Sequence, residues 1–401
     1  MNFKSLKDID VAGQRVLLRA DLNVPAQRGR VTDTTRIDRL KPTIDYLRDA
    51  GAKILVLSHF GRPEGEQNPE MSLAFLLPTL EQRWGAKVAF TPNCIGEKAE
   101  KASANMENGD ILLLENVRFH KGEKANSSEF IAQLAKLGDI YVNDAFSAAH
   151  RAHATTEGLA RSLPSAAGIL MEKELTALDS ALENPEKPVL AITGGSKISS
   201  KLNVLNNLIE RVDYLVLGGG MANTFMNAKG IDIGSSLCEH DMSNEARAIM
   251  DKAEKLGCEI ILPQDCVVVS DLQLNAPHDV VDAASIPSDK MAIDIGPETN
   301  TYIRSILEKC KTVVWNGPMG VFEIKPFDRG TNRLAEDVAA LTRNGTLNSI
   351  AGGGDTVAAL ENAGVTGDFT YISSAGGAFL EWLEGKSLPG VAALEESKEA
   401  A

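Results

Sequence analysis

Short runs rich in Val, Ile and Leu recur along the whole chain, and segments long enough for a helix separate them. Ten such runs lie at 15–18, 53–57, 111–114, 139–142, 188–193, 214–217, 259–262, 312–315, 348–351 and 369–372. A nearly continuous apolar run, rather than an alternating one, is typical of a parallel strand that is buried on both faces. The pattern predicts an α/β fold with doubly wound, Rossmann-like parallel sheets in three αβα layers.

The length of the chain predicts more than one domain, because 401 residues exceed what one hydrophobic core fills. Residues 171–182 place apolar side chains at helical spacing, and Pro185 and Pro188 end that helix. We therefore expect an N-terminal domain at 1–170, a helix and linker at 171–187 that act as a hinge, and a C-terminal domain at 188–387.

The charge balance excludes several classes of partner. The chain has 41 Lys and Arg against 55 Asp and Glu, a net charge of −14, which disfavours binding to nucleic acid or to anionic lipid. The five cysteines show neither disulfide nor zinc spacing, so we expect reduced thiols, most of them buried. No apolar run suits a signal peptide or a membrane span, which predicts a cytoplasmic protein that does not contact a membrane.

Arginines follow the predicted strands of the first half. They are Arg36, Arg62, Arg118 and Arg151. A guanidinium group matches phosphate and carboxylate oxygens and stays charged at physiological pH, so four of them on one crevice would bind a small, multiply anionic molecule. The alternative is that each arginine pairs with a surface carboxylate, which is less plausible for the set than for one member. Asp21 and Asn23 add groups suited to hydroxyls, which indicates a hydroxylated acid phosphate.

Two histidines near the end of the first half allow a different interpretation. His150 and His153 are three residues apart and could bind a metal on one helix face. No Cys or acidic residue stands at a spacing that would supply a third ligand. We therefore favour anion binding over metal binding here.

Glycines follow the predicted strands of the second half. The glycine-rich segments are 194–197, 218–220, 316–320, 352–355 and 376–377. Such segments let backbone amides approach phosphate oxygens at a helix N-terminus, although glycines also serve plain turns. Neither G-x-x-x-x-G-K-[ST] nor G-x-G-x-x-G occurs, which disfavours ordinary P-loop ATPases and dinucleotide-binding dehydrogenases.

Charged residues beside these glycines suit a nucleotide. Lys197 and Lys201 would share one helix face if a helix begins near Ser196, and an anion between them would offset their repulsion. Asp355 is suited to Mg²⁺, which prefers one or two carboxylates together with phosphate oxygens. The alternative is that Asp355 is a helix N-cap, and one residue can fill both roles.

Together these segments resemble the phosphoglycerate kinase family over nearly the whole chain. On the substrate side the matching segments are R-A-D-L-N-V-P at 19–25, H-F-G-R at 59–62, E-N-V-R-F at 115–119, D-A-F at 144–146 and H-R-A-H at 150–153. On the nucleotide side they are G-G-S-K at 194–197 with Lys201, N-G-P-M-G-V-F-E at 316–323 and G-G-G-D-T at 352–356.

The resemblance implies reversible phosphoryl transfer from 1,3-bisphosphoglycerate to MgADP, giving 3-phosphoglycerate and ATP in glycolysis. It also implies a glycerate-binding first lobe, a nucleotide-binding second lobe, closure across a hinge, and a C-terminal tail at 388–401 that returns to the first lobe. Nothing in the sequence requires more than a monomer.

Roles for individual residues follow from the same resemblance. The expected substrate contacts are Asp21, Asn23, Arg36, His59, Phe60, Gly61, Arg62, Arg118 and Arg151. The expected nucleotide contacts are Lys201, Glu323, Gly353, Gly354, Asp355 and Thr356, with Glu323 on the ribose and Asp355 on Mg²⁺. For the transfer itself, we expect Arg36 and Lys197 to flank the moving group while the amides of Gly353, Gly354, Gly376 and Gly377 hold the remaining oxygens.

The chain departs from the family pattern in two places. Ala375 stands in a loop that usually reads S-T-G-G-G-A, followed by Phe379 where a small polar residue is common, and Ser147-Ala148 replaces the usual Gly-Thr. We expect position 375 to avoid a positive φ and so to tolerate a side chain. Two rival functions remain: a non-catalytic two-lobed anion-binding protein, and a kinase for another acyl phosphate. The charges of Lys197, Lys201 and Asp355 disfavour the first.

Overall fold

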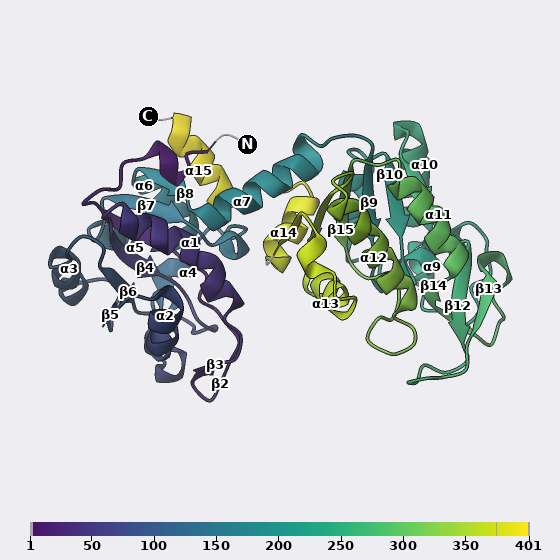
Figure 1. The fold of residues 1–401 in the computed structure, drawn as a ribbon, viewed down its shortest axis with the longest axis horizontal. Helices are drawn as coiled ribbons and strands as arrows, with labels where there is room; N and C mark the ends of the chain where they lie inside the picture. Colours follow the sequence, from purple (N-terminus) through teal and green to yellow (C-terminus); the bar gives the residue numbers. More distant parts are fainter. Residues whose placement is uncertain (1–2, 374, 400–401) are drawn as a thin grey trace. The chain divides into compact units, whose positions relative to one another are not determined.

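The chain folds into two compact units. The computed structural model describes residues 3–373 and 375–399, with side chains described up to residue 395. The first unit holds the chain up to residue 176 together with the residues from 387 onward, and the second holds residues 177–386. The division lies within the predicted hinge segment 171–187, where helix α7 (Ile169–Leu178) continues into a π-helical turn, η7 (Asp179–Glu183) (Figure 1).

The first unit contains a six-stranded parallel sheet. Its spatial order is β5 (Val88–Thr91), β6 (Ile111–Leu114), β4 (Lys53–Leu57), β1 (Arg15–Arg19), β7 (Ile140–Asn143) and β8 (Ser165–Ala167). The order of connection reverses between β1 and β7. Ligands of open α/β sheets bind at the carboxyl ends of strands beside such a reversal, because the loops there turn away from each other.

Both faces of this sheet are covered. Val16 and Leu18 pack in one apolar cluster with helices α1 (Thr35–Asp49) and α2 (Leu77–Trp84), and Leu17, which points to the opposite face, is equally buried. The other helices before α7 are α3 (Glu97–Ala104), α4 (Lys121–Lys124), α5 (Ser128–Ala135) and α6 (Leu159–Ser162).

The end of the chain returns to the first unit. Helix α15 (Pro389–Glu399) packs beside α6 and β8, and the amide of Gly390 donates to the Ala149 carbonyl at 2.8 Å (Figure 1). This helix occupies most of the predicted tail 388–401. Residues 400 and 401 of that tail lie outside the described residues.

The second unit contains another six-stranded parallel sheet. Its order is β11 (Glu259–Ile261), β10 (Tyr214–Leu217), β9 (Val189–Thr193), β15 (Thr312–Asn316), β16 (Asn348–Gly352) and β17 (Tyr371–Ser373). Numbered within the sheet, this is the order 3-2-1-4-5-6 of dinucleotide-binding folds. The order reverses between β9 and β15. The predicted fold class is therefore confirmed for both units.

The ten predicted strands are present with ends within two residues of those predicted. The sequence did not predict β5, β8, the hairpin of β2 (Ala26–Gln27) and β3 (Arg30–Val31), or the antiparallel sheet of β12 (Asp265–Val269), β13 (Asp279–Asp282) and β14 (Met291–Ile295). The missed strands include short or exposed ones, such as β13, which lack a continuous apolar run. The helices of this unit are α8 (Leu202–Leu208), α9 (Gly219–Ala228), α10 (Ser243–Leu256), α11 (Pro297–Leu307), α12 (Arg329–Arg343), α13 (Gly354–Asn362) and α14 (Gly376–Leu383).

Candidate active site

Asp21, Asn23 and Arg36 form one hydrogen-bonded group at the end of β1. The Asp21 carboxylate is buried, and its Oδ2 lies 2.8 Å from Arg36 Nη1. The same nitrogen donates to the Asn23 carbonyl oxygen at 2.8 Å, while Asn23 Oδ1 accepts from the amide of Gly61 at 2.9 Å. These contacts join the loop after β1 to the loop after β4. Arg36 remains about one third exposed, with 34% of its side-chain surface accessible, so its guanidinium can be reached by a ligand.

His59 is buried, and a neighbouring arginine fixes its tautomer. Arg19 Nη2 lies 2.8 Å from His59 Nδ1, and because a guanidinium can only donate, Nδ1 must accept. Burial, followed by the charges of Arg19 and Arg118, holds the pKa of His59 well below its usual value. His59 is therefore a neutral imidazole with its proton on Nε2. Arg19 is part of the first motif, but the sequence did not predict it as a functional residue. Its position at the end of an apolar strand could have indicated such a role.

The remaining arginines of this unit form a cluster of positive charge without carboxylate partners. Among the described residues, Arg62, Arg118 and Arg151 form no ion pair; Arg118 Nη1 donates to the Gly61 carbonyl at 2.9 Å, and Arg151 Nε donates to His150 at 3.1 Å. Burial, and then the charges of Arg151 and Arg19, lower the pKa of Arg118 to about 10. The alternative that each arginine pairs with a surface carboxylate is wrong for these three.

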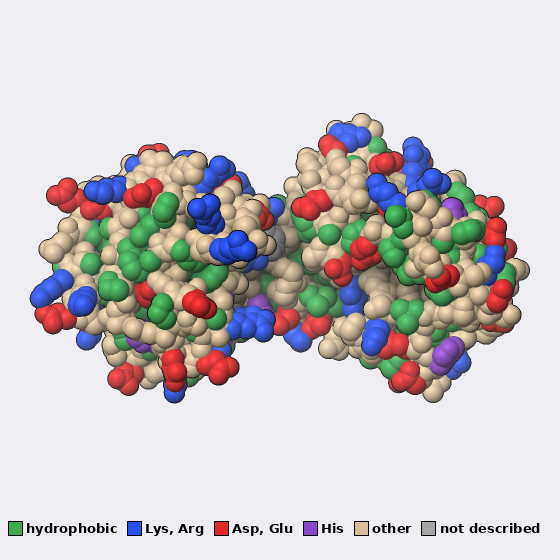
Figure 2. Space-filling model, turned by 90° about the horizontal axis from the view of Figure 1, so that it is seen from below, with side chains coloured by type: hydrophobic (Ala, Val, Ile, Leu, Met, Phe, Trp, Pro, Cys, Tyr) green, Lys and Arg blue, Asp and Glu red, His purple; other side chains and the backbone are tan. Residues whose placement is uncertain are grey.

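This cluster differs from the general surface. Acidic and basic side chains are interspersed over both units on the face that Figure 2 shows. In contrast, positive charge is concentrated around His59, whose pKa is lowered first by burial and then by the charges of Arg19, Arg118, Arg151 and His153. An anion is the ligand that would relieve this repulsion.

His150 and His153, for which we considered metal binding but favoured anion binding, have other partners in the structure. His150 accepts from Arg151, and His153 Nδ1 lies 3.9 Å from the single carboxylate of Glu123. Within residues 3–373 and 375–399, no group of three or more His, Cys, Asp or Glu side chains is arranged to hold a metal ion.

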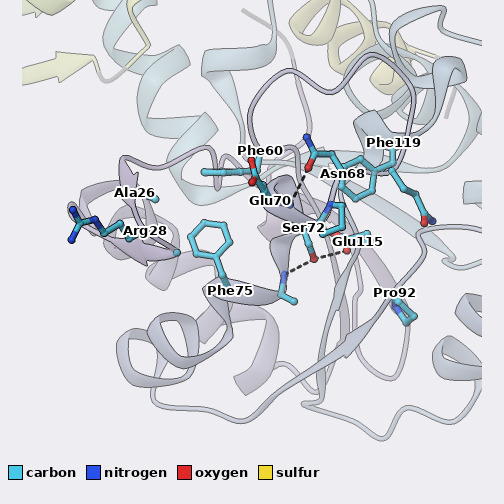
Figure 3. A pocket seen from close by; sticks show the side chains of 14 residues that line it. Ala26, Arg28, Phe60, Asn68, Glu70, Ser72, Phe75, Pro92, Glu115 and Phe119 are labelled. Carbon is cyan, nitrogen blue, oxygen red and sulfur yellow. Dashed lines mark hydrogen bonds between the residues drawn. The ribbon is translucent and has the colours of Figure 1, made fainter.

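Phe60 lines a cavity of about 870 Å³ in the first unit (Figure 3). Its ring packs edge-on against Phe75, with ring centroids 4.9 Å apart. On the cavity wall Ser72 donates to the buried carboxylate of Glu115 at 2.6 Å. Of the predicted substrate residues, Phe60 is the one that lines this cavity. Its backbone carbonyl accepts a hydrogen bond from Asn116 Nδ2 at 2.8 Å, which holds the backbone of Phe60 in place.

In the second unit, Lys201 and Asn316 connect the loops at the reversal point. Lys201 Nζ donates to the Gly194 carbonyl at 2.9 Å, to the Asn316 carbonyl at 3.1 Å and to Asn316 Oδ1 at 2.7 Å. Burial lowers the pKa of Lys201 to about 8, and the charge of Asp355 opposes that shift. Asn316 Nδ2 donates in turn to the Gly352 carbonyl at 2.8 Å. Asn316 was not predicted as a site residue, because its role depends on strands that are far apart in the sequence.

The glycine loops bring two helix N-termini together. Gly353 has φ +99° and is the N-cap of α13, while Gly376 begins α14. A Cβ at Gly376 would lie 3.9 Å from the amide nitrogen of Gly354, and nothing lies within 4 Å of a Cβ at Gly354 itself. Exposed amides and open space are what a phosphate group requires at a helix N-terminus. Ala375 has φ −109°, which confirms that this position needs no glycine.

Two sequence interpretations of this unit are wrong. Helix α8 begins at Leu202 rather than near Ser196, so Lys197 and Lys201 do not share a helix face; Lys197 lies exposed in the preceding loop. The N-cap of α13 is Gly353, and Asp355 is the second residue of that helix, in its first turn, where it is exposed. Among the described residues, Lys197, Asp355 and Glu323 make no hydrogen bond or ion pair that ties them to the other predicted nucleotide residues. Thr356 Oγ1 accepts from the amide of Gly317 at 2.7 Å, which connects the first turn of α13 to the glycine-rich segment 316–320.

Comparison with known proteins identifies the family. The phosphoglycerate kinase family model matches residues 6–386. The chain is 59% identical over 394 residues to the phosphoglycerate kinase of Rhodospirillum centenum, covering 98% of this chain and 100% of that one, and 55% identical to that of Sinorhizobium medicae, covering 99% and 100%. The solved structure of the Coxiella burnetii phosphoglycerate kinase is similar with a TM-score of 0.92 at 41% identity, covering 98% of this chain and 99% of that one. The solved structure of the Pyrococcus horikoshii phosphoglycerate kinase is similar with a TM-score of 0.81 at 32% identity, covering 99% of this chain and 100% of that one. The chain belongs to the phosphoglycerate kinase family.

Proposed function

We propose that the first unit binds the phosphoglycerate and the second unit binds the nucleotide. The chain is a phosphotransferase with a carboxyl group as acceptor, and it catalyses the glycolytic reaction of its family. This reaction is favoured over a non-catalytic anion-binding role and over transfer to another acyl phosphate. The observation that supports our division of roles is a contrast between the units: three arginines of the first have no carboxylate partner among the residues described, and two helix N-termini of the second are adjacent.

In the first unit, the charges match a molecule with a phosphate at one end and a carboxylate at the other. Arg62, Arg118 and Arg151 supply charged donors for the phosphate. Neutral His59 supplies one further N–H without adding charge. Asp21 and Asn23 face the middle of such a molecule as acceptor and amide, which suits the hydroxyl of a glycerate. Phe60 and Gly61 hold the loop that carries these groups.

In the second unit, the phosphates of ADP or ATP would lie over the amides of Gly353, Gly354 and Gly376, with Lys201 beneath. The exposed carboxylate of Asp355 fits Mg²⁺, because it has no partner among the described residues and stands beside the predicted phosphate site. When bound, Mg²⁺ would neutralise charge on the nucleotide phosphates. Thr356 fixes the loop, and Glu323 would contact the ribose.

For the transfer itself, both acceptors are ionised near neutral pH, so positioning and charge neutralisation must lower the barrier. We assign this task to Arg36 from the first unit and Lys197 from the second. The transfer requires the two ligands to meet, so closure of the units is part of the proposal. Scattering with both ligands bound should give a smaller radius of gyration than the free protein, and an unchanged radius would count against closure.

The test is the variant Arg36→Ala in a coupled assay of ATP formation from 1,3-bisphosphoglycerate. Loss of an arginine that stabilises phosphoryl transfer costs about 10³-fold or more in turnover. We expect Arg36→Ala to show this loss of turnover, while its affinity for MgADP, measured by calorimetry, stays nearly unchanged. The control is Lys41→Ala, which removes another cation of α1, one that forms an ion pair with Asp45 at 2.6 Å. Turnover of Arg36→Ala within about threefold of the wild type would contradict the role.

We further propose that the protein works as a cytoplasmic monomer, in keeping with its glycolytic family. No described helix is long and apolar enough to cross a membrane. Light scattering at assay concentrations tests the oligomeric state, and a stable dimer would contradict it.

A further inference from the structure

The hydroxyl of Ser147 donates a hydrogen bond to the carboxylate of Asp21. Ser147 lies in the short 3-10 helix η5 (Phe146–Ala148) after β7, and Asp21 follows β1. The two strands are adjacent in the sheet, and the order of connection reverses between them. Two residues 126 positions apart therefore meet at the centre of the candidate substrate site.

In this contact two donors share one oxygen of Asp21. Asp21 Oδ2 accepts from Ser147 Oγ and from Arg36 Nη1, while within the described part of the chain Oδ1 accepts only from the amide of Asn23, at 3.2 Å. Asp21 is 8% exposed, so water can replace little of what a lost donor supplies. A buried carboxylate oxygen without a donor costs free energy, because the charge has left water without compensation.

The second donor matters when Arg36 turns toward a ligand. If Arg36 leaves Oδ2 for an anionic group of the bound ligand, Ser147 is the donor that remains on that oxygen. The Asp21 carboxylate then keeps its orientation. A glycine at position 147, the residue usual in the family pattern, has no side chain to do this, so the arrangement depends on the residue that this chain carries.

We propose that Ser147 is a positioning residue: its hydroxyl orients the Asp21 carboxylate toward the substrate hydroxyl while Arg36 contacts an anionic group of the ligand. The inference rests on the proposed role of Asp21 in binding the glycerate. Ser147 itself acts through Asp21 and contacts no reacting atom. Its effect therefore belongs to binding of the substrate in both ground and transition states.

The expected effect is a change in KM without a matching change in kcat. Ser147→Ala should raise the KM for 3-phosphoglycerate about tenfold, since loss of one hydrogen bond to a charged group has roughly that effect on affinity. The kcat should stay within about twofold, because uniform binding is lost rather than transition-state stabilisation. Ser147→Thr keeps a hydroxyl and should restore most of the affinity. Ser162→Ala, which removes a hydroxyl bonded to the Gly158 carbonyl in the same unit, is the matched control and should change nothing.

The decisive experiment compares two ligands by calorimetry: 3-phosphoglycerate and 3-phosphooxypropanoate, which lacks the 2-hydroxyl. We expect Ser147→Ala to weaken binding of 3-phosphoglycerate about tenfold and to leave the analogue's affinity unchanged, so that the preference of the wild type is lost. Equal weakening of both ligands would show a merely structural effect and overturn the proposal. Unchanged binding of 3-phosphoglycerate by Ser147→Ala would overturn it as well.

The outcome also separates this inference from the proposed function. A wild-type protein that binds neither ligand would contradict the assignment of the substrate to the first unit. The proposed role of Ser147 depends on that assignment and would be overturned as well. A wild-type protein that binds both ligands equally would contradict the role of Asp21 and hence of Ser147. If the wild type prefers 3-phosphoglycerate and Ser147→Ala keeps that preference, the proposal for Ser147 alone is overturned.

Discussion

The affinity for nucleotide should depend on pH through Lys201. Its ammonium group is held by three oxygen acceptors of the Gly194 and Asn316 region, and burial lowers its pKa to about 8. A neutral amine carries no positive charge and therefore no longer attracts the phosphate electrostatically. Raising the pH from 7 to 9 therefore removes the charge without changing the chain.

The magnitude follows from that pKa. With a pKa of about 8, about 90% of the free protein carries the Lys201 charge at pH 7 and about 10% at pH 9. If ADP binds only the charged form, its Kd rises about tenfold over this range, equivalent to about 1.4 kcal/mol. The phosphates of ADP are already ionised above pH 7, since their last pKa is near 6, and contribute little to the change.

Calorimetry with MgADP at pH 7, 8 and 9 measures both the Kd and the protons taken up. At pH 8 about half a proton should enter per ADP bound, because Lys201 is half charged when free and fully charged when bound. Lys201→Gln should bind more weakly at every pH, with no slope. Lys252→Gln, which removes an exposed lysine paired with Glu210, should behave as the wild type. A flat wild-type profile without proton uptake would refute the reasoning.

Two further outcomes test the second unit. Gly194→Ala should abolish MgADP binding and lower the unfolding midpoint, because its Cβ would lie 1.7 Å from the Pro318 carbonyl oxygen. Gly354→Ala, whose Cβ would meet no atom within 4 Å, should fold normally and lose only nucleotide affinity. Equal unfolding midpoints for the two variants would contradict this contrast. Burial raises the pKa of Asp294 to about 8, so the folded state holds a proton that the unfolded state releases near pH 4. Stability contributed by this group is present below that pH and declines as pH rises toward 8, so the unfolding midpoint of Asp294→Asn should fall less between pH 5 and 8 than that of the wild type. Parallel curves would exclude Asp294 as the cause.

Much of the fold could be predicted because its signals are local. The continuous apolar runs at 53–57 and 214–217 are strands with the predicted ends, since buried parallel strands need apolar side chains on both faces. The start of α8 could not be predicted in this way. The segment after β9 passes close to the Pro318 carbonyl and extends as a loop before α8, and helical spacing between two lysines carries no information about that contact.

The sequence by itself determined the class of the two units, the motifs at their strand ends and the kinds of charge those ends carry, because each depends on residues adjacent in the chain. Only the tertiary structure decided which partner each charged group has: Arg19 fixes the proton of His59, Asn316 holds Lys201, and Ser147 shares Asp21 with Arg36. In the chain, Arg19 and His59 are 40 residues apart, Lys201 and Asn316 are 115 apart, and Asp21 and Ser147 are 126 apart. They meet because the order of strands in each sheet brings distant loops to one edge, where burial and neighbouring charges then set the ionisation of His59 and Lys201.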